Sequence, residues 1–401
     1  MERAQYHMKI LFYRYGSICE PDIIHSFQEL GNEVTEITVE IYNKSFTPAE
    51  GVSLLTDILF SHNYDFVFSI NFYPFISEVC NIFKLRYICW TVDSPVAELY
   101  SPAIYNEWNR IFLFDRDQYN TFYPYNPNCI FHLPLASNPK RWASVISSAT
   151  PADVSRFSGN ISFVGSLYTE KCDYNKLSAL PDYLRGYLSS IMLAQSKVYG
   201  YYFLEELLPV SALNDLSAFC ENECSFEEKT IENSRSSVTR FFLEPIISAM
   251  ERIHTMELLG SHFPVDLYTG SDTTGLPVHN GGTVKTLTEM PLVFHYSKIN
   301  LNITSKSIRS GLPLRIFDIL GCGGFLLTNY QSELAEYFTP GYDLVCYSSD
   351  EELLEKVEYY LSHEKERNEI ALNGLQTVIQ YHNYPERLLQ MISLAYGITK
   401  G

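Results

Sequence analysis

The chain has 401 residues, of which 46% are hydrophobic and 19% are charged, and its formal net charge at pH 7 is -18. A chain of this length and composition exceeds one ordinary core and is too apolar to be disordered, so we expect two globular domains. The negative charge disfavours a nucleic-acid-binding protein, because a phosphate backbone requires a basic surface.

Targeting signals and cysteine usage indicate a cytoplasmic protein. The first residues, MERAQYHMKILFYRYG, lack the apolar core and cleavage pattern of a signal peptide, and no later run approaches the length of a transmembrane segment. Among nine cysteines only Cys220 and Cys224 are close in sequence, without a partnering Cys or His pair at zinc spacing. We interpret the cysteines as reduced thiols.

Short apolar strands alternate with helices through the first 150 residues. The strand MKILFYRYG ends at Gly16, the helix PDIIHSFQELGNEV follows, and VTEITVEIY is the next strand. Three more predicted strands, DFVFSI, RYICWTVD and RIFLFD, continue the alternation. This order predicts a doubly wound, mostly parallel sheet.

Asp93 is the candidate for chemistry in this first part of the chain, because it ends the strand RYICWTVD just before Pro95. Open α/β sheets bind ligands at the carboxyl ends of their strands, where a carboxylate can act as a general base. The structural alternative is that Asp93 caps a helix over AELYSPAIYNEWN. Asp115 and Asp117, in a similar position after the next strand, are weaker candidates.

A stretch rich in Ser, Ala and Pro at 138–160 suggests a boundary between domains at 1–150 and 151–385. The strand in ISFVGSLYTEK opens the second domain, and its Gly165 permits close backbone approach. Residues of about 173–260 have helical patterns, which predicts a helical insertion. FPVDLYTG is a later strand that ends at Gly270, and a final helix at 386–401 is expected to pack back toward the first domain.

The run from Ser297 to Asn329 predicts a strand, a loop, a helix, a glycine stop and a second strand. Gly311 precedes the helix, which would begin near Pro313, and its first-turn amides lack intrahelical partners. Those amides, the positive helix end and Arg315 are suited to bind a diphosphate. Asp318, about one turn further on, can accept hydrogen bonds from ribose hydroxyls. The alternative is an ordinary core βαβ unit with no ligand.

The segment from Arg315 to Tyr384, which begins RIFDILGCGGFLLTNYQSELAEYF, resembles the donor domain of group 1 glycosyltransferases of the spore maturation protein CgeB type. Weaker resemblances are FVGSLY at Phe163 to Tyr168, and YDFVFSINFYPFISEVC with CWTVDSP in the first third. Together they cover most of the chain except roughly 173–240. The resemblance implies an α/β protein of the GT-B fold, with two Rossmann-like domains facing a cleft and a helical insertion in the second.

The resemblance also implies a nucleotide-sugar donor, of which a UDP-sugar is the favoured kind, held mainly by the second domain. Relatives often carry a positive residue directly after the glycine at 165, where this chain has Ser166. The remaining charge partners for the diphosphate are Lys171, Lys306, Arg309 and, first in rank, Arg315. For His295 the alternative is a buried, hydrogen-bonded core histidine. The expected catalytic residues are Asp93 and Arg315, and the expected donor-binding residues are Gly165, Ser166, Gly270, His295, Tyr296, Lys298, Asn302, Gly311, Leu312, Pro313 and Asp318.

Retaining glycosyltransferases often carry two glutamates separated by seven residues around the donor helix. Here those positions hold Ser310 and Asp318, so the incomplete pair favours inversion through a general base. No Asp-x-Asp motif stands at the end of an apolar strand with a GT-A-like surrounding. We therefore expect no required metal or other cofactor, and helix amides with Arg315 would stabilise the leaving diphosphate.

The sequence thus predicts a glycosyltransferase that acts on a hydroxyl of a glycan, a protein or a small molecule. Two alternatives remain at this stage. One is a non-catalytic nucleotide-sugar binding protein with a decayed site, and the other is a sugar-nucleotide epimerase on the same fold.

Overall fold

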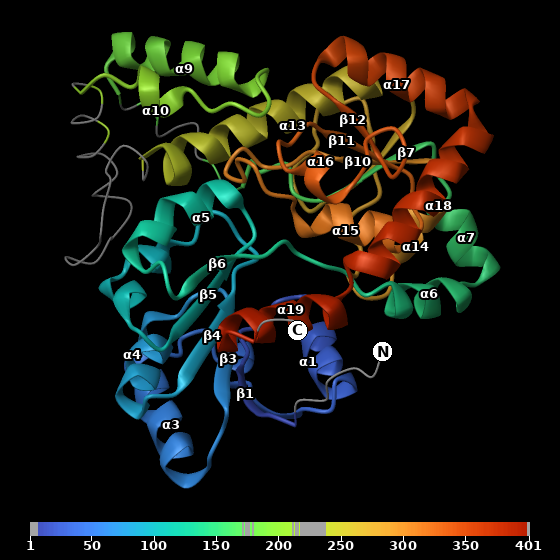
Figure 1. The fold of residues 1–401 in the computed structure, drawn as a ribbon. Coiled ribbons are helices and arrows are strands. Elements are labelled where there is room, and N and C mark those ends of the chain that lie inside the picture. Colours follow the sequence, from blue (N-terminus) through green and yellow to red (C-terminus); the bar gives the residue numbers. More distant parts are fainter. Residues whose placement is uncertain are drawn as a thin grey trace. The chain divides into compact units, whose positions relative to one another are not determined.

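The computed structural model describes residues 7–170, 172, 177–178, 180–210, 212, 216 and 238–398. The described residues form two compact units. Residues 7–136 and 382–398 belong to the first unit, and the described residues between 137 and 381 belong to the second (Figure 1).

The first unit is built on a parallel six-stranded sheet in the order β2-β1-β3-β4-β5-β6. Its strands are β1 (Lys9–Tyr13), β2 (Glu33–Ile37), β3 (Phe66–Ile70), β4 (Arg86–Trp90), β5 (Asn109–Leu113) and β6 (Ile130–His132). Its helices include α1 (Glu20–Glu29), α2 (Val39–Tyr42), α3 (Pro48–Ser61), α4 (Pro74–Phe83), α5 (Arg116–Phe122) and α19 (Tyr384–Tyr396). Strand β3 is buried along its whole length, as expected for a central parallel strand covered on both faces.

One predicted helix of the first unit is replaced by two short 3-10 turns. The segment after Asp93 forms η1 (Ala97–Tyr100) and η2 (Pro102–Tyr105). Ser101 lies between them with φ -70° and ψ 145°, which is the extended conformation that the following proline favours. Pro102 therefore interrupts what the apolar pattern had predicted as one helix.

The second unit contains another parallel six-stranded sheet, in the order β12-β11-β10-β7-β8-β9. Its strands are β7 (Ile161–Val164), β8 (Val265–Tyr268), β9 (His279–Asn280), β10 (Ile299–Asn302), β11 (Leu326–Asn329) and β12 (Val345–Tyr347). The strand order reverses between β7 and β10, which are paired neighbours. Such a switch point is where doubly wound sheets bind their ligands.

Helices cover both faces of this second sheet. On one face α13 (Glu244–Gly260) and α17 (Asp350–Ser362) share a hydrophobic core with the strands through residues such as Met256 and Leu353. Figure 1 shows α14 (Met290–Tyr296) and α15 (Leu314–Gly321) on the other side of the sheet. The same unit includes α6 (Pro139–Ser147), α7 (Pro151–Phe157), α16 (Leu334–Tyr337) and α18 (Glu364–Tyr381).

A helical segment with its own small core follows β7. It comprises α9 (Asp182–Ser196), α10 (Leu204–Leu207) and the π-helical turn η4 (Val238–Leu243). Leu188, Leu204 and Ile247 are among the residues of this core, so the segment joins the start of α13. Cys220 and Cys224 lie outside the described residues.

The last helix, α19, packs within the first unit although it follows the second in sequence. Its Tyr384 ring lies 6.2 Å from that of Trp90. Arg110 Nε donates to the carbonyl oxygen of Ala395 at 3.0 Å, and Arg86 lies over the Tyr396 ring at 4.1 Å. The C-terminal helix is thus an integral part of the first unit.

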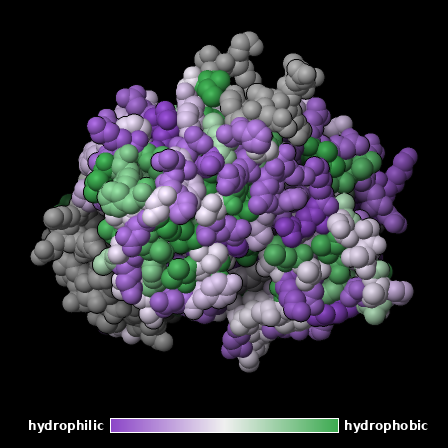
Figure 2. Space-filling view, turned by 90° about the horizontal axis from the view of Figure 1, so that it is seen from below, coloured by the Kyte–Doolittle hydropathy of each residue, from purple (hydrophilic) through white to green (hydrophobic). Residues whose placement is uncertain are grey.

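Polar side chains predominate on the face shown in Figure 2, and hydrophobic side chains occur there in separate small groups. Among the described helices, none has both the length and the apolar character that crossing a membrane requires.

Candidate functional site

Arg252 of α13 lies across the switch point of the second sheet. Its Nη1 donates to the carbonyl oxygen of Ser166 at 2.6 Å, and its Nη2 donates to that of Ile303 at 2.7 Å. The guanidinium also lies 4.3 Å from the Tyr168 ring centroid. Arg252 is 8% exposed, and burial lowers its pKa. One side chain thereby fixes the spacing of the two loops that leave the sheet after β7 and β10.

The loop after β7 is held by a carboxylate with hydroxyl partners. Ser166 Oγ donates to Glu170 Oε1 at 2.5 Å and accepts from the Tyr168 amide at 2.7 Å. Ser271 Oγ donates to Glu170 Oε2 at 2.8 Å. Burial would raise the pKa of Glu170, but these hydrogen bonds outweigh it and hold the pKa below its usual value. The loop carrying Gly165 and Ser166 is therefore fixed against the one that follows Gly270.

The loop after β10 leads into α15. Asn302, at the end of β10, donates from Nδ2 to Thr328 Oγ1 at 2.9 Å and to Thr304 Oγ1 at 3.0 Å. Gly311 and Leu312 are buried, and Pro313 occupies the N-cap without a side-chain cap. Of the first-turn amides, that of Ile316 donates to the Pro313 carbonyl oxygen at 3.1 Å, and those ahead of it lie before the first intrahelical acceptor. The helix begins one residue after the position that its sequence predicted.

Arg315 lies in the first turn of α15 and packs toward α14. Its guanidinium is 5.3 Å from the Phe294 ring centroid, and Nη1 contacts the sulfur of Met290. Burial lowers the pKa of Arg315, and the neighbouring Asp318 carboxylate opposes that effect. Among the described residues, no carboxylate accepts a hydrogen bond from this guanidinium, which has five N–H donors.

Asp318 lies one turn further along α15 and is 4% exposed. Its Oδ1 is 3.4 Å from Ser137 Oγ, which donates to it. The same hydroxyl accepts from Trp142 Nε1 at 2.8 Å. The hydrogen bond from Ser137 to Asp318 is thus long for an O–H···O contact.

Two of the other predicted charge partners are used within the protein. Lys306 is 1% exposed and lies 3.3 Å from Glu251 Oε2. Arg309 Nε donates to Glu244 at 2.9 Å, and its Nη2 donates to Glu205 at 2.6 Å. These two cations link the loop after β10 to α13 and α10, so the structure does not support them as diphosphate ligands. Lys171 lies outside the described residues.

Three expected donor-binding residues lie at the opposite edge of the sheet. His295 and Tyr296 end α14, and Lys298 directly precedes β10 with its amide 3.0 Å from the Gly159 carbonyl oxygen. They therefore lie at the amino edge, because all strands of this sheet run parallel. His295 is exposed, and its Nδ1 is 2.9 Å from the Cys322 carbonyl oxygen. The buried-histidine alternative is therefore wrong, although the ring is hydrogen-bonded.

In the first unit, Asp93 is exposed beyond the end of β4 and has a defined polar neighbour. Asn71 donates from Nδ2 to Asp93 Oδ2 at 2.7 Å, and its Oδ1 accepts from the Val92 amide at 3.1 Å. Asn71 has φ +60°, a left-handed conformation that asparagine tolerates better than most residues. The helix-cap alternative for Asp93 is wrong, because the N-cap of η1 is Val96.

Asp115 has a structural role. It is fully buried, accepts from the Asp117 amide at 3.2 Å as the N-cap of α5, and accepts from Ser94 Oγ at 3.2 Å. Asp117 lies in the first turn of the same helix. Of the three candidate bases, Asp93 alone is both exposed and outside a helix cap.

Comparison with known proteins finds a family match for part of the chain. Residues 235–393 match the family model Glyco_trans_1_2, described as glycosyl transferase-like. Among curated protein sequences, none matches the chain significantly.

Solved structures resemble the whole chain at low sequence identity. The Anabaena protein HepE, in complex with UDP, is 10% identical with a TM-score of 0.54, over 98% of this chain and 100% of that chain. Sucrose-phosphate synthase from Thermosynechococcus elongatus is 10% identical with a TM-score of 0.54, and the match covers 98% of this chain and 99% of that chain. A UDP-forming α,α-trehalose-phosphate synthase from Burkholderia xenovorans is 10% identical with a TM-score of 0.55, and the match covers 99% of this chain and 100% of that chain.

These matches confirm the predicted fold class, because the two parallel sheets and their helices correspond to GT-B structures. The family match confirms the predicted enzyme class. The chain is a glycosyltransferase.

Proposed function

We propose that the protein is a CgeB-type glycosyltransferase that moves a sugar from a UDP-sugar to a hydroxyl of a glycan, a protein or a small molecule. The observation that carries this proposal is the start of α15, where uncapped amides and the Arg315 guanidinium lie next to Asp318. The structural relative HepE was solved with UDP, and the Burkholderia enzyme is described as UDP-forming, which supports uridine as the nucleoside of the donor.

The donor would be held by the loops at the carboxyl edge of the second sheet. The amides of the first turn of α15 and Arg315 would bind the diphosphate, because both favour negative charge. Asp318 would accept hydrogen bonds from the ribose. Gly165, Ser166 and Gly270 would border the donor from the loops after β7 and β8, and Asn302, Gly311, Leu312 and Pro313 would shape the approach from β10.

Transfer would proceed by direct displacement with inversion, and no metal is required by this scheme. Asp93 takes the proton of the acceptor hydroxyl while that oxygen bonds to the anomeric carbon. The bond from that carbon to the diphosphate oxygen breaks, and UDP leaves with the electron pair. Asn71 holds one carboxylate oxygen of Asp93. The other oxygen accepts no hydrogen bond from the described residues, so it is available to an acceptor.

Arg315 provides the test of the donor site. The purified protein is incubated with a panel of nucleotide sugars while release of the nucleoside diphosphate is followed, and UDP affinity is measured by calorimetry. Arg315→Ala should weaken UDP about 10- to 100-fold, because a hydrogen bond to a charged group contributes about 1.5–3 kcal/mol.

Arg156→Ala is the matched control, because Arg156 is an exposed arginine of the same unit that is paired with Glu289. It should leave UDP affinity unchanged. Equal UDP affinity in a folded Arg315→Ala protein would refute the site. UDP binding without release from any nucleotide sugar would instead indicate a binding protein.

A further inference from the structure

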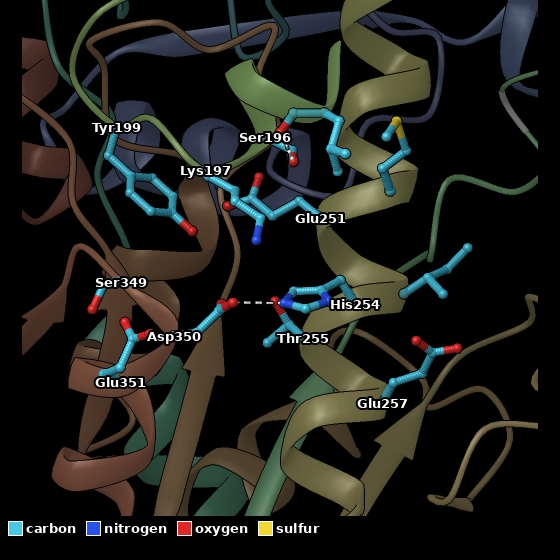
Figure 3. Close-up of a pocket in the computed structure, with 13 residues that line it drawn as sticks. Ser196, Lys197, Tyr199, Glu251, His254, Thr255, Glu257, Ser349, Asp350 and Glu351 are labelled. Carbon is cyan, nitrogen blue, oxygen red and sulfur yellow. Dashed lines mark hydrogen bonds and ion pairs between the residues drawn. The ribbon is translucent and has the colours of Figure 1, made fainter. Parts of the chain in front are cut away.

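A cavity of about 500 Å³ lies among α9, α13 and α17 in the second unit. The turn after α9, the middle of α13 and the start of α17 supply its walls (Figure 3). Its volume is within the range of small-molecule sites. None of its lining residues belongs to the donor site proposed above. Because α13 and α17 cover the sheet face opposite α15, the cavity is a separate site.

The charges around the cavity disfavour an anionic ligand. Four carboxylates line the cavity, those of Glu251, Glu257, Asp350 and Glu351. They outnumber the ammonium group of Lys197, which also lines it. A nucleotide or a sugar phosphate would therefore meet an excess of like charge, which is strongly unfavourable. The occupant is thus neutral or cationic.

Two of the four lining carboxylates already have cationic or imidazole partners. Glu251 is 3% exposed and is paired with Lys306, whose ammonium also lies 4.1 Å from the Tyr199 ring centroid. Asp350 Oδ2 lies 2.7 Å from His254 Nε2, as the dashed line in Figure 3 marks. A small cation would have to displace these partners, so the arrangement favours a neutral ligand.

Hydrogen-bonding groups of both kinds face the cavity. Thr255, Ser349 and Tyr199 contribute hydroxyls, Lys197 contributes an ammonium donor, and the carboxylates contribute acceptors. Sugar hydroxyls both donate and accept, so they match such a mixed set. Leu193, Met250 and Ile253 add apolar surface for the C–H groups of a pyranose ring.

We propose that this cavity binds a neutral saccharide unit, separately from the nucleotide-sugar donor. A glycosyltransferase with such a site can hold a glycan at a residue other than the one that it extends. The site stands on its own cavity and side chains, so it does not depend on the assignment of Arg315 or Asp93.

Ligand-observed saturation-transfer NMR tests this proposal on the full chain. The probes are glucose, galactose, mannose, N-acetylglucosamine and maltose, each with and without saturating UDP. At least one probe should bind, and UDP should not displace it. His254→Trp should weaken that binding at least tenfold, because the indole fills the cavity.

His262→Trp is the matched control. His254 is 48% exposed, so tryptophan can be accommodated there, and His262 is an exposed histidine just beyond the same helix and outside the cavity. His262→Trp should bind the probe like the parent. Thermal melting verifies that both variants fold. Asp350→Asn, which keeps the shape but removes the charge beside His254, should weaken the probe several-fold.

Four results would overturn the proposal. They are binding of none of the five sugars, equal binding by His254→Trp and the parent, displacement of the sugar by UDP, and capture of putrescine in place of sugars. Failure of the donor site would have a different signature, because UDP binding would be absent while saccharide binding persisted.

Discussion

Asp93 and Asn71 form a hydrogen-bonded pair at the carboxyl edge of the first sheet, at 2.7 Å. If Asp93 is the base, Asp93→Asn removes the group that takes the proton and retains the side-chain shape. General-base contributions are about 10²–10⁴-fold, so transfer should fall at least 100-fold while UDP affinity remains near that of the parent. Rates of UDP release and calorimetric UDP titration measure the two effects.

Asp115→Asn is the control for this experiment. Asp115 caps α5, and asparagine caps helices about as well as aspartate, so transfer should change only a few-fold. If Asp93→Asn also retained transfer within a few-fold of the parent, Asp93 would have a structural role and another base would be needed.

Asp318 is expected to bind the ribose of the donor, whereas Arg315 is expected to bind its diphosphate. Substitutions of the two residues should therefore affect ligand affinity differently. Asp318→Ala should weaken UDP more than inorganic pyrophosphate, and it should raise KM for the donor more than it lowers kcat. Ser137→Ala removes the hydroxyl that donates to Asp318 and keeps the carboxylate, so it should bind UDP like the parent. An equal loss of UDP and pyrophosphate affinity in Asp318→Ala would mean that the carboxylate only supports the fold.

Local sequence signals predicted some of these residues and could not predict others. Gly165 directly follows a strand and Pro313 directly precedes a helix, so their neighbours in sequence define their roles. Arg252 gave no such signal, because it lies inside a helix and its partners are 86 and 51 residues away. Asn71 was missed for the same reason, since its contact with Asp93 spans 22 residues.

At the scale of elements, a buried ionic cluster joins the helical segment to the loop after β10. Arg309 of the loop contacts Glu205 of α10 and Glu244 of α13. Removal of Arg309 would leave the fully buried Glu244 without its closest cation, which is strongly destabilising. The loop after β10 is therefore held by elements whose sequence showed only helical periodicity.

Glu205 gives this cluster a defined pH dependence. Burial raises the pKa of Glu205, but the charge and hydrogen bonds of Arg309 outweigh it, and the net pKa is lowered. The pKa of a glutamate in the unfolded state is about 4.3. Because the pKa of Glu205 is lower in the folded state, its ionised form stabilises the fold at pH values above about 4.3, and this stability is lost as the pH falls through the folded pKa. Glu205→Gln should therefore destabilise by about 1 kcal/mol at pH 7, and the difference should shrink as the pH falls below the unfolded pKa of about 4.3.

Chemical denaturation of both proteins between pH 3 and pH 7 measures this difference. Burial raises the pKa of Glu244 and the Glu205 charge raises it further, so Glu205→Gln also lowers the pKa of Glu244 toward its ordinary value. Glu206→Gln, at the exposed neighbouring position, is the control and should show a small difference at every pH. A Glu205→Gln effect that persisted unchanged at pH 3 would contradict the ion-pair explanation.

The order of the elements was predictable from sequence. To predict which edge of the sheet a residue occupies, one also needs the direction in which each strand runs. His295, Tyr296 and Lys298 were expected near the donor because they come just before a donor strand. Parallel strands place the residue before a strand and the residue after it at opposite edges. The same argument retains Asn302, at the end of β10, at the carboxyl edge.

At the scale of the whole molecule, sequence order and unit membership differ at the C-terminus. The second unit ends at Tyr381, and the chain from His382 onward belongs to the first unit. At the other junction the first unit ends at Ala136, and α6, which lies within the Ser-, Ala- and Pro-rich stretch, belongs to the second. Composition marks this region as a junction, but only tertiary contacts assign α6 and α19 to a unit.

The contribution of α19 can be measured through Leu388, which is fully buried and lies on a helix that packs against α1. Leu388→Ala should destabilise the first unit by about 2–5 kcal/mol, because it leaves a cavity in a close-packed core. Hydrogen-exchange mass spectrometry should then show lost protection in β1, β3 and β4, with β10 and β11 unchanged. Leu394→Ala, at a 43% exposed position of the same helix, should change protection little. Equal loss of protection in both sheets would instead show that the two units unfold as one cooperative body, since a defect confined to the first unit would then be transmitted to the second.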